Sequence, residues 1–181
     1  NTFHPQNASA LVRHCEAFGL QDLHTVETRC KFNPNVNIVR GTDKWVDITR
    51  HDSTTDAIEA LKGAGYRIVA TTPHRQSCTP ESFDVAKSPF CLVFGTEHAG
   101  VTDEIIDAAD EYLCIPMCGM VESLNVSASA AILIYMLSQR MRLCSAIDWQ
   151  LDKRDRIDVL FRWIMSSARD AERVLERQFP L

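Results

Sequence analysis

The chain has 181 residues, of which 45% are hydrophobic, so it is long enough to bury a substantial core. Its formal net charge is −5, which argues against a general nucleic-acid binder, because such proteins usually carry an excess of basic residues. The sequence contains no apolar run of the twenty or so residues that span a membrane, and its first residues do not resemble a secretory signal.

The chain does not begin with Met, so we expect that an upstream segment is absent from it. Its seven cysteines are odd in number and include no CxxC pair, a pattern that favours free thiols in a reducing compartment, and hence a cytoplasmic protein. The six histidines are scattered, and no HxxxH pair indicates a structural metal.

Short strands and helices alternate along the first 145 residues. In chain order the sequence predicts a helix over 7–18, a strand over 23–26, a basic loop over 28–44, a strand over 45–49, a helix over 53–61, strands over 66–71 and 90–94, a helix over 102–109, a strand over 112–115 and a helix over 128–137. Asn7, Ser53 and Thr102 are suited to capping the first three helices.

This alternation predicts an α/β fold with a mostly parallel sheet, helices on both faces, and ligands at the carboxyl ends of the strands. We expect one domain over residues 1–145 and a helical extension over 146–181.

The spacing of apolar residues in the extension predicts an amphipathic helix over about 152–178. At 100° per residue, one face is apolar, with Ile157, Leu160, Phe161, Ile164, Ala168, Ala171, Val174 and Leu175. An arginine stripe lies on the opposite side, formed by Arg162, Arg169, Arg173 and Arg177. On its own this stripe fits a solvated face with ion pairs better than a binding surface.

The stretch from Ile115 to Leu137, IPMCGMVESLNVSASAAILIYML, joins a strand end to an apolar helix through a polar loop. Asn125 and Ser127 can satisfy the unpaired N–H groups at the start of this helix. The same junction could hold a small polar ligand on backbone groups, so a capped core helix and a binding site are both open interpretations.

Three polar segments are expected near the same edge of the sheet: residues 1–13, 95–100 and 115–127. None contains GxGxxG or GxxxxGK[ST], which disfavours the usual dinucleotide-binding and P-loop enzymes. The absence of GxSxG likewise disfavours a hydrolase with a nucleophile elbow.

These segments resemble the three signature motifs of the SpoU branch of the SPOUT superfamily, the RNA ribose 2′-O-methyltransferases. The first is NASALVR followed by EAFG over 7–19, the second is VFGTEHAG over 93–100, and the third is IPM through SLNVS over 115–127. Within the branch, GMVESLNVS and the short helical extension are most similar to enzymes that methylate the D-loop guanosine at position 18 of tRNA.

The resemblance implies S-adenosylmethionine as the methyl donor, a deep trefoil knot in the C-terminal part of the domain, and a homodimer through the knot region. It also implies site residues. The donor is expected to contact Thr71, Gly95, Ile115, Met117 and Leu124, and the catalytic group is expected to comprise Arg13, Asn7, Glu97, Ser123 and Asn125. Candidate RNA contacts are Arg162, Arg169, Arg173, Arg29, Lys31 and Arg40.

Arg13 corresponds to the central catalytic residue of the family. Because a guanidinium stays protonated, we expect Arg13 to grip a phosphate and stabilise the developing 2′-alkoxide rather than to act as a base.

Two other functions remain open. One is methylation of ribosomal RNA by an enzyme of the same branch, and the other is non-catalytic RNA binding or assembly on the same fold. The presence of Arg13, Glu97 and Asn125 favours catalysis.

Overall fold

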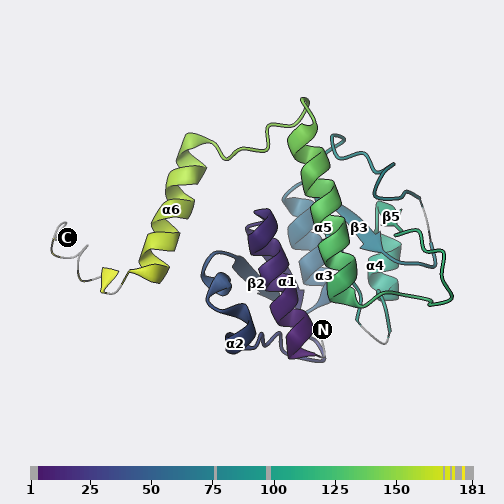
Figure 1. Ribbon diagram of the computed structural model, residues 1–181, viewed down its shortest axis with the longest axis horizontal. Coiled ribbons are helices and arrows are strands. Elements are labelled where there is room, and N and C mark those ends of the chain that lie inside the picture. Colours follow the sequence, from purple (N-terminus) through teal and green to yellow (C-terminus); the bar gives the residue numbers. More distant parts are fainter. Residues whose placement is uncertain are drawn as a thin grey trace. The chain divides into compact units, whose positions relative to one another are not determined.

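The computed structural model describes residues 4–75, 77–96, 99–168, 170, 171, 173 and 177. The chain divides into two compact units, Asn1–Ile147 and Asp148–Leu181 (Figure 1).

All the described strands of the first unit are parallel to their neighbours. β1 (Asp22–Val26) pairs with β2 (Asp47–His51) in register. A second group has the order β4-β3-β5, with β3 (Arg67–Thr71) between β4 (Phe90–Val93) and β5 (Glu111–Leu113). The predicted parallel α/β architecture is confirmed, but the strands hydrogen-bond as a two-stranded and a three-stranded sheet rather than as one.

Helices lie on both sides of these strands. α3 (Thr54–Gly63) packs against β3 and against α4 (Asp103–Ala108), while α1 (Pro5–Phe18) packs along α5 (Val126–Leu143), which lies in front of β3 in Figure 1. At the end of this helix pair, the Arg142 guanidinium donates a 2.6 Å hydrogen bond to the Phe18 carbonyl.

Apolar side chains from these helices and strands form two cores. One joins the sheet to α5 through Val69, Leu113, Leu133 and Leu137. The other lies beneath α1, around Val12 and Phe32. All seven cysteines are free, and burial raises the pKa of the Cys15 and Cys91 thiols to about 11, so both stay protonated near neutral pH.

Two local predictions were wrong. Asn7 does not cap α1, because the helix begins at Pro5 with His4 at the N-cap; proline suits the first helical position, where no N–H is needed. The predicted loop over 28–44 contains a one-turn helix, α2 (Val36–Val39), and a 3₁₀ turn at Thr42–Lys44. Elements this short leave no periodic pattern in a sequence.

Other caps are as predicted. The Ser53 side chain accepts a hydrogen bond from the Asp56 N–H, and the Asn125 side chain accepts one from the Ser127 N–H. Thr102 stands at the N-cap of α4, but its side chain makes no capping hydrogen bond.

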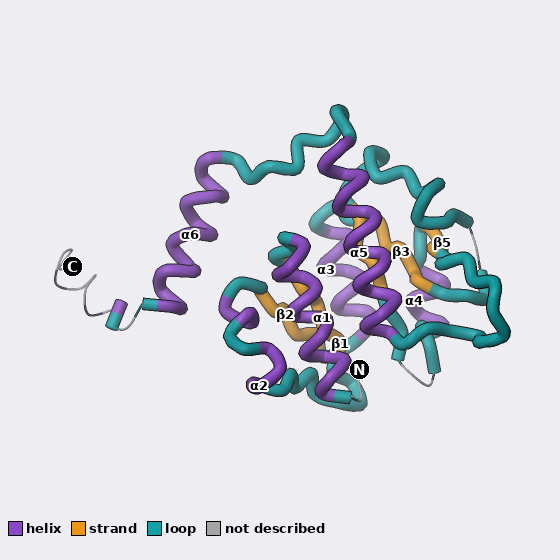
Figure 2. Tube along the Cα trace, viewed as in Figure 1, coloured by secondary structure: helices purple, strands orange, loops and turns teal. Residues whose placement is uncertain are grey.

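β5 is hydrogen-bonded on both of its sides. β3 lies along one side (Figure 2), and the chain at residues 77–78 lies along the other. There the Ser77 and Cys78 N–H groups donate to the Tyr112 carbonyl at 3.0 and 3.2 Å, and the Cys114 N–H donates to the Cys78 carbonyl at 3.1 Å. The later strand therefore sits between two segments that precede it in sequence.

The second unit contains α6 (Lys153–Ser167), whose first turn is capped by Asp152. The apolar residues expected on one face include Ile157, Leu160, Phe161 and Ile164, which all remain exposed. α6 ends at Ser167, where Ala168 turns to extended backbone, so the helix predicted to run on to about 178 is interrupted here rather than continuous.

No helix in the described ranges combines the length and the hydropathy needed to cross a membrane.

Candidate active site

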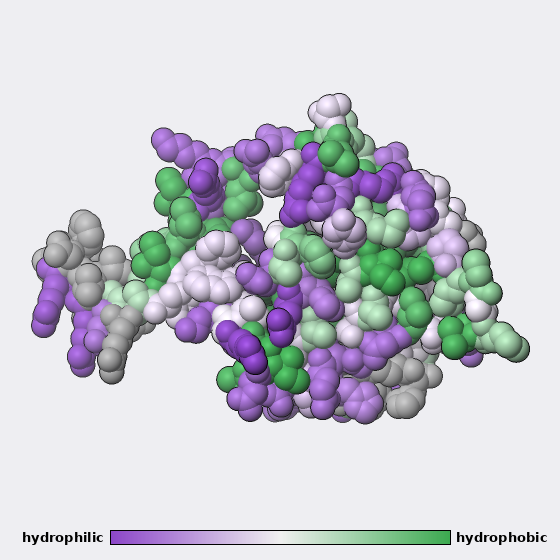
Figure 3. Space-filling view, viewed as in Figure 1, coloured by the Kyte–Doolittle hydropathy of each residue, from purple (hydrophilic) through white to green (hydrophobic). Residues whose placement is uncertain are grey.

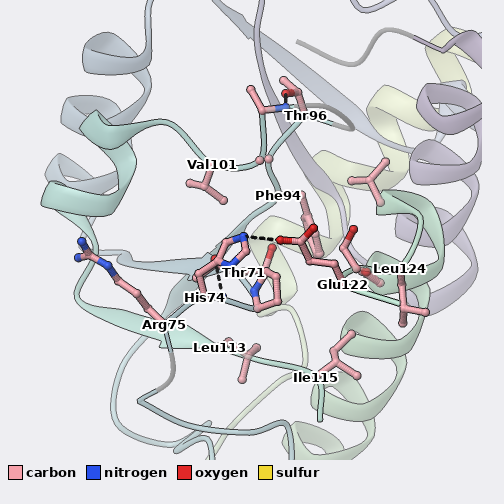
Figure 4. Close-up of a pocket in the computed structure, with 18 of the residues that line it drawn as sticks. Thr71, His74, Arg75, Phe94, Thr96, Val101, Leu113, Ile115, Glu122 and Leu124 are labelled. Carbon is pink, nitrogen blue, oxygen red and sulfur yellow. Dashed lines mark hydrogen bonds and ion pairs between the residues drawn. The ribbon is translucent and has the colours of Figure 1, made fainter. Parts of the chain in front are cut away.

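A cavity of about 510 Å³ opens at the carboxyl ends of β3, β4 and β5. The register of the sheet brings these three ends together, since Ala70 is paired with Val93 and Thr71 with Leu113. The loops that leave the strands form the walls, and the start of α5 closes one side (Figure 4). A parallel sheet therefore places its ligand-sized cavity at the edge where such sites are expected.

Every residue predicted to contact a methyl donor lines this cavity, namely Thr71, Gly95, Ile115, Met117 and Leu124. Thr71 lies at the end of β3, and its hydroxyl donates a 2.9 Å hydrogen bond to the Val93 carbonyl of β4. The structure thus brings together five residues from three separate segments.

Gly95 is required by a close approach of two backbone segments. A Cβ at this position would lie 2.0 Å from the Gly100 carbonyl carbon and 2.3 Å from the Val101 nitrogen. The approach is held by paired hydrogen bonds between Thr96 and Gly100, at 2.9 and 3.0 Å. Only glycine lets this loop fold back beside β4.

Several cavity residues were not predicted from the sequence. Phe94 follows β4, His74 and Arg75 follow β3, and Glu122 lies on the loop before α5. Their position directly after strand ends was a usable signal, because those loops converge in a parallel sheet.

Two of these residues face each other in the cavity. The His74 Nε2 and Glu122 Oε1 atoms are 3.8 Å apart, and Figure 4 shows the two side chains meeting between the loops that carry them. The Arg75 guanidinium instead lies 5.6 Å from the centre of the Tyr112 ring.

The predicted catalytic residues are partly assembled in one chain. Ser123 lines the cavity. The Asn125 Nδ2 donates a 3.2 Å hydrogen bond to the Oδ1 of Asn7, a buried residue on α1, while the Asn125 Oδ1 accepts from the Ser127 N–H at 2.8 Å. Asn125 therefore both caps α5 and links it to a residue 118 positions earlier. Glu97 lies outside the described residues.

Arg13 is exposed on α1 and is not among the residues that line the cavity. Its guanidinium donates a 3.3 Å hydrogen bond to the Ile38 carbonyl of α2. Within a single chain, the structure does not bring Arg13 into the cavity.

His14, next to Arg13, lies against the start of α5. Burial lowers the pKa of His14 and the neighbouring Arg13 charge adds to this, while a hydrogen bond with the Ser127 backbone opposes it. The imidazole is therefore neutral at neutral pH.

Of the predicted RNA contacts, Arg29, Lys31 and Arg40 are exposed on the first unit. Their segment is tied to α1, since the Asn35 N–H donates a 2.7 Å hydrogen bond to the Ser9 hydroxyl. In the second unit Arg162 and Arg173 are exposed, and Arg173 forms a 3.9 Å ion pair with Asp170. Arg169 lies outside the described residues.

Among the residues that the structure describes, no three His, Cys, Asp or Glu side chains are grouped in a way that could hold a metal ion.

Comparison with known proteins identifies relatives that match most of the chain. The model of the SpoU rRNA methylase family matches residues 1–135. A tRNA (guanosine(18)-2′-O)-methyltransferase of Borreliella burgdorferi is 35% identical over 161 residues, which cover 89% of this chain and 73% of that protein.

Solved structures agree with this relationship. A structure described as the Aquifex aeolicus TrmH/SpoU tRNA modifying enzyme superposes with a TM-score of 0.78 at 29% identity, covering 93% of this chain and 87% of that one. An AdoMet-bound rRNA methyltransferase of Sinorhizobium meliloti superposes with a TM-score of 0.68 at 25% identity, covering 77% of this chain and 54% of that one.

Proposed function

The chain belongs to the SpoU methylase family, and we propose that it transfers a methyl group from S-adenosylmethionine to a ribose 2′-hydroxyl of tRNA, at the D-loop guanosine of position 18. The observation that carries this proposal is the cavity at the strand ends, which is lined by all five residues expected to contact the methyl donor. The guanosine-18 methyltransferase from Borreliella burgdorferi, at 35% identity, supports the choice of substrate.

The cavity suits the proposed methyl donor in size and in lining. A volume of about 510 Å³ lies within the range of small-molecule sites. Phe94, Ile115 and Leu124 offer apolar surface for a purine ring, and Thr71 and Ser123 add hydroxyl groups. S-adenosylmethionine supplies an electrophilic methyl group when bound.

The side chains around the cavity have separate roles in this proposal. Ser123 and Asn125 hold the substrate ribose so that its 2′-hydroxyl is aligned with the methyl group, and such positioning can supply much of the rate acceleration. Asn7 fixes Asn125 through their hydrogen bond. Glu97 is proposed as a further member of the catalytic group, because it lies in the second of the three family motifs.

Arg13 is proposed to act from a second copy of the chain. It is exposed, it carries a permanent charge, and it does not line the cavity of its own chain. A homodimer that packs the loop before α5 against its partner would place Arg13 at the partner's cavity. Met120 and Val121 on this loop are exposed apolar residues that fit such an interface, and Figure 3 shows further apolar atoms over the region of α5.

A trefoil knot in this region remains part of the proposal. It is supported by the hydrogen bonds on both sides of β5, because β3 and residues 77–78 are the two ends of the loop through which a knotted chain would pass this strand. We also retain a methyltransferase domain over 1–145 with a helical extension over 146–181, in which Arg162, Arg169 and Arg173 would contact phosphates together with Arg29, Lys31 and Arg40.

The direct test is methylation of a tRNA transcript in the presence of S-adenosylmethionine, with the modified ribose located by mass spectrometry of nuclease fragments. We expect 2′-O-methylguanosine at position 18. A transcript with 2′-deoxyguanosine at this position should accept no methyl group there.

A ribosomal RNA substrate is the second candidate, because the matching family model describes rRNA methylases. Purified ribosomal RNA should be included in the same assay. Methylation of ribosomal RNA with none in tRNA would replace the proposed substrate, and binding of RNA without transfer to either would favour a non-catalytic role.

A further inference from the structure

Glu122 lines the cavity and presents a solvent-exposed carboxylate to it. Its side chain extends from the loop before α5 toward His74 on the opposite wall (Figure 4). The two groups are 3.8 Å apart, and their side chains are 81% and 69% exposed. An ion pair as long and as exposed as this contributes little energy, so Glu122 can exchange its partner at small cost.

Two further charged residues, Asp103 and Arg75, line the cavity, and each interacts with groups other than His74. Asp103 lies in the first turn of α4, where the amino end of the helix stabilises a negative charge. The Arg75 guanidinium lies against the Tyr112 ring. Glu122 is therefore the carboxylate best placed to meet a positive charge on a molecule in the cavity.

We propose that Glu122 stabilises the positively charged sulfonium of S-adenosylmethionine and so makes the cavity prefer the methyl donor over its product, whose sulfur carries no charge. The inference rests on the proposed function. Ser123 and Asn125, one and three residues beyond Glu122, are assigned there to the reacting ribose. The methyl group and the sulfur that bears it must then lie close to the loop that carries Glu122.

This interaction exists only before the transfer. Once the methyl group has left, the sulfur of S-adenosylhomocysteine is a neutral sulfide, and the carboxylate returns to His74. Glu122 thus binds the ground state more strongly than the transition state, in which the positive charge is already fading. Its removal should raise KM for the donor without lowering kcat.

The test compares two ligands that differ by one methyl group and one charge. Calorimetric titration with S-adenosylmethionine and with S-adenosylhomocysteine is applied to the wild-type protein and to Glu122→Gln, which keeps the shape and removes the charge. We expect the variant to bind S-adenosylmethionine about threefold to tenfold more weakly, while its affinity for S-adenosylhomocysteine changes by less than about twofold.

Asp103→Asn is the matched control, since it removes another described carboxylate that lines the cavity. It should leave the ratio of the two affinities unchanged. Equal weakening of both ligands by Glu122→Gln, no weakening of either, or the same change of ratio in Asp103→Asn would overturn the inference. If the wild-type protein binds neither ligand, the proposed function itself fails.

Discussion

Arg67 shows how a buried charge is accommodated beside the site. Its guanidinium pairs with Glu111, donates to the Asp84 and Ser88 carbonyls at 2.8 and 3.1 Å, and lies 5.0 Å from the centre of the Phe83 ring. One side chain thus fastens the loop before β4 to both β3 and β5, the strands that support the cavity.

Replacing this residue should destabilise the protein strongly. Arg67→Met is expected to lower the free energy of unfolding by about 3 kcal/mol, because Glu111 and two carbonyls lose a buried partner. Urea unfolding gives the value. Arg50→Met is the control: Arg50 pairs with Glu27 but its side chain is half exposed, so the loss should stay below about 1 kcal/mol. Equal losses would show that burial of Arg67 is not what matters.

The histidine pair on β1 and β2 predicts acid sensitivity. The His24 Nδ1 and His51 Nε2 atoms are 2.9 Å apart, and burial, aided by His51 and opposed by Asp22, lowers the pKa of His24. Folded His24 therefore binds a proton less readily than unfolded His24, whose pKa is about 6.5.

The contribution of neutral His24 to the free energy of unfolding has its full value above about pH 6.5. This contribution is lost as the pH falls through the lowered pKa of the folded state. His24→Gln should flatten the dependence of unfolding free energy on pH below 6.5, as measured by urea unfolding between pH 5 and 7.5 (roughly the titration range of histidine). His14, whose pKa is lowered too, should account for a separate share in His14→Gln. An unchanged slope in His24→Gln would contradict this explanation.

At the scale of the element, the backbone at Gly95 packs directly against the backbone at Gly100 and Val101. Gly95→Ala places a methyl group 2.0 Å from the Gly100 carbonyl carbon, so the loop has to move away from the cavity that it lines. We expect donor affinity to fall by at least about tenfold, with a smaller loss of stability, because the loop is near the surface. Calorimetry and thermal unfolding measure the two effects.

Gly100→Ala gives a useful comparison for that loop. Gly100 has a left-handed φ of 66° but open space around a Cβ, so its replacement costs backbone strain without a clash. A larger loss of donor affinity in Gly100→Ala than in Gly95→Ala would argue against the steric explanation.

The sequence predicts most of the long elements, because Ser53 and Asn125 cap helices in the way their local chemistry favours, and β3 and β4 are largely apolar runs. It does not predict α2, a single turn too short to leave a periodic pattern, nor the division of the strands into two sheets, which depends on contacts between distant residues. The site shows the same division. The family resemblance points to Thr71, Gly95, Ile115, Met117 and Leu124, which all line the cavity, whereas the Asn7–Asn125 hydrogen bond and the approach of His74 to Glu122 arise only in the folded chain.

At the scale of the whole molecule, shared active sites can be tested by mixing two inactive variants. Arg13→Ala removes the residue proposed to act on the partner, and Leu124→Arg blocks the cavity of its own chain. If each site combines Arg13 of one subunit with the cavity of the other, a refolded equal mixture should recover about a quarter of wild-type activity, since half of the dimers hold one intact site. Methyl transfer to tRNA is the measurement, and an inactive mixture would contradict the proposed dimer.

The net charge of −5 requires that RNA binding depend on local basic surface. Replacing Arg29, Lys31 and Arg40 by Gln should weaken tRNA binding and reduce the slope of log K against log salt concentration by about 0.7 to 0.9 for each phosphate that the variant no longer neutralises. Filter binding at several salt concentrations gives the slope. Lys62→Gln, in the last turn of α3, should leave it unchanged, and donor affinity should be the same in all variants.

The position of β5 between β3 and residues 77–78 also determines the order in which parts of the protein can fold during synthesis. Ser77 finds its partner Tyr112 only 35 residues further along, so a nascent chain emerging from the ribosome exposes both flanking segments with their hydrogen-bonding groups still open to water. The cavity walls cannot close until the middle strand has been translated and inserted. A ribosome that stalls before residue 111 would therefore leave a chain with two unfinished β edges, the kind of surface that chaperones recognise and that neighbouring chains can join.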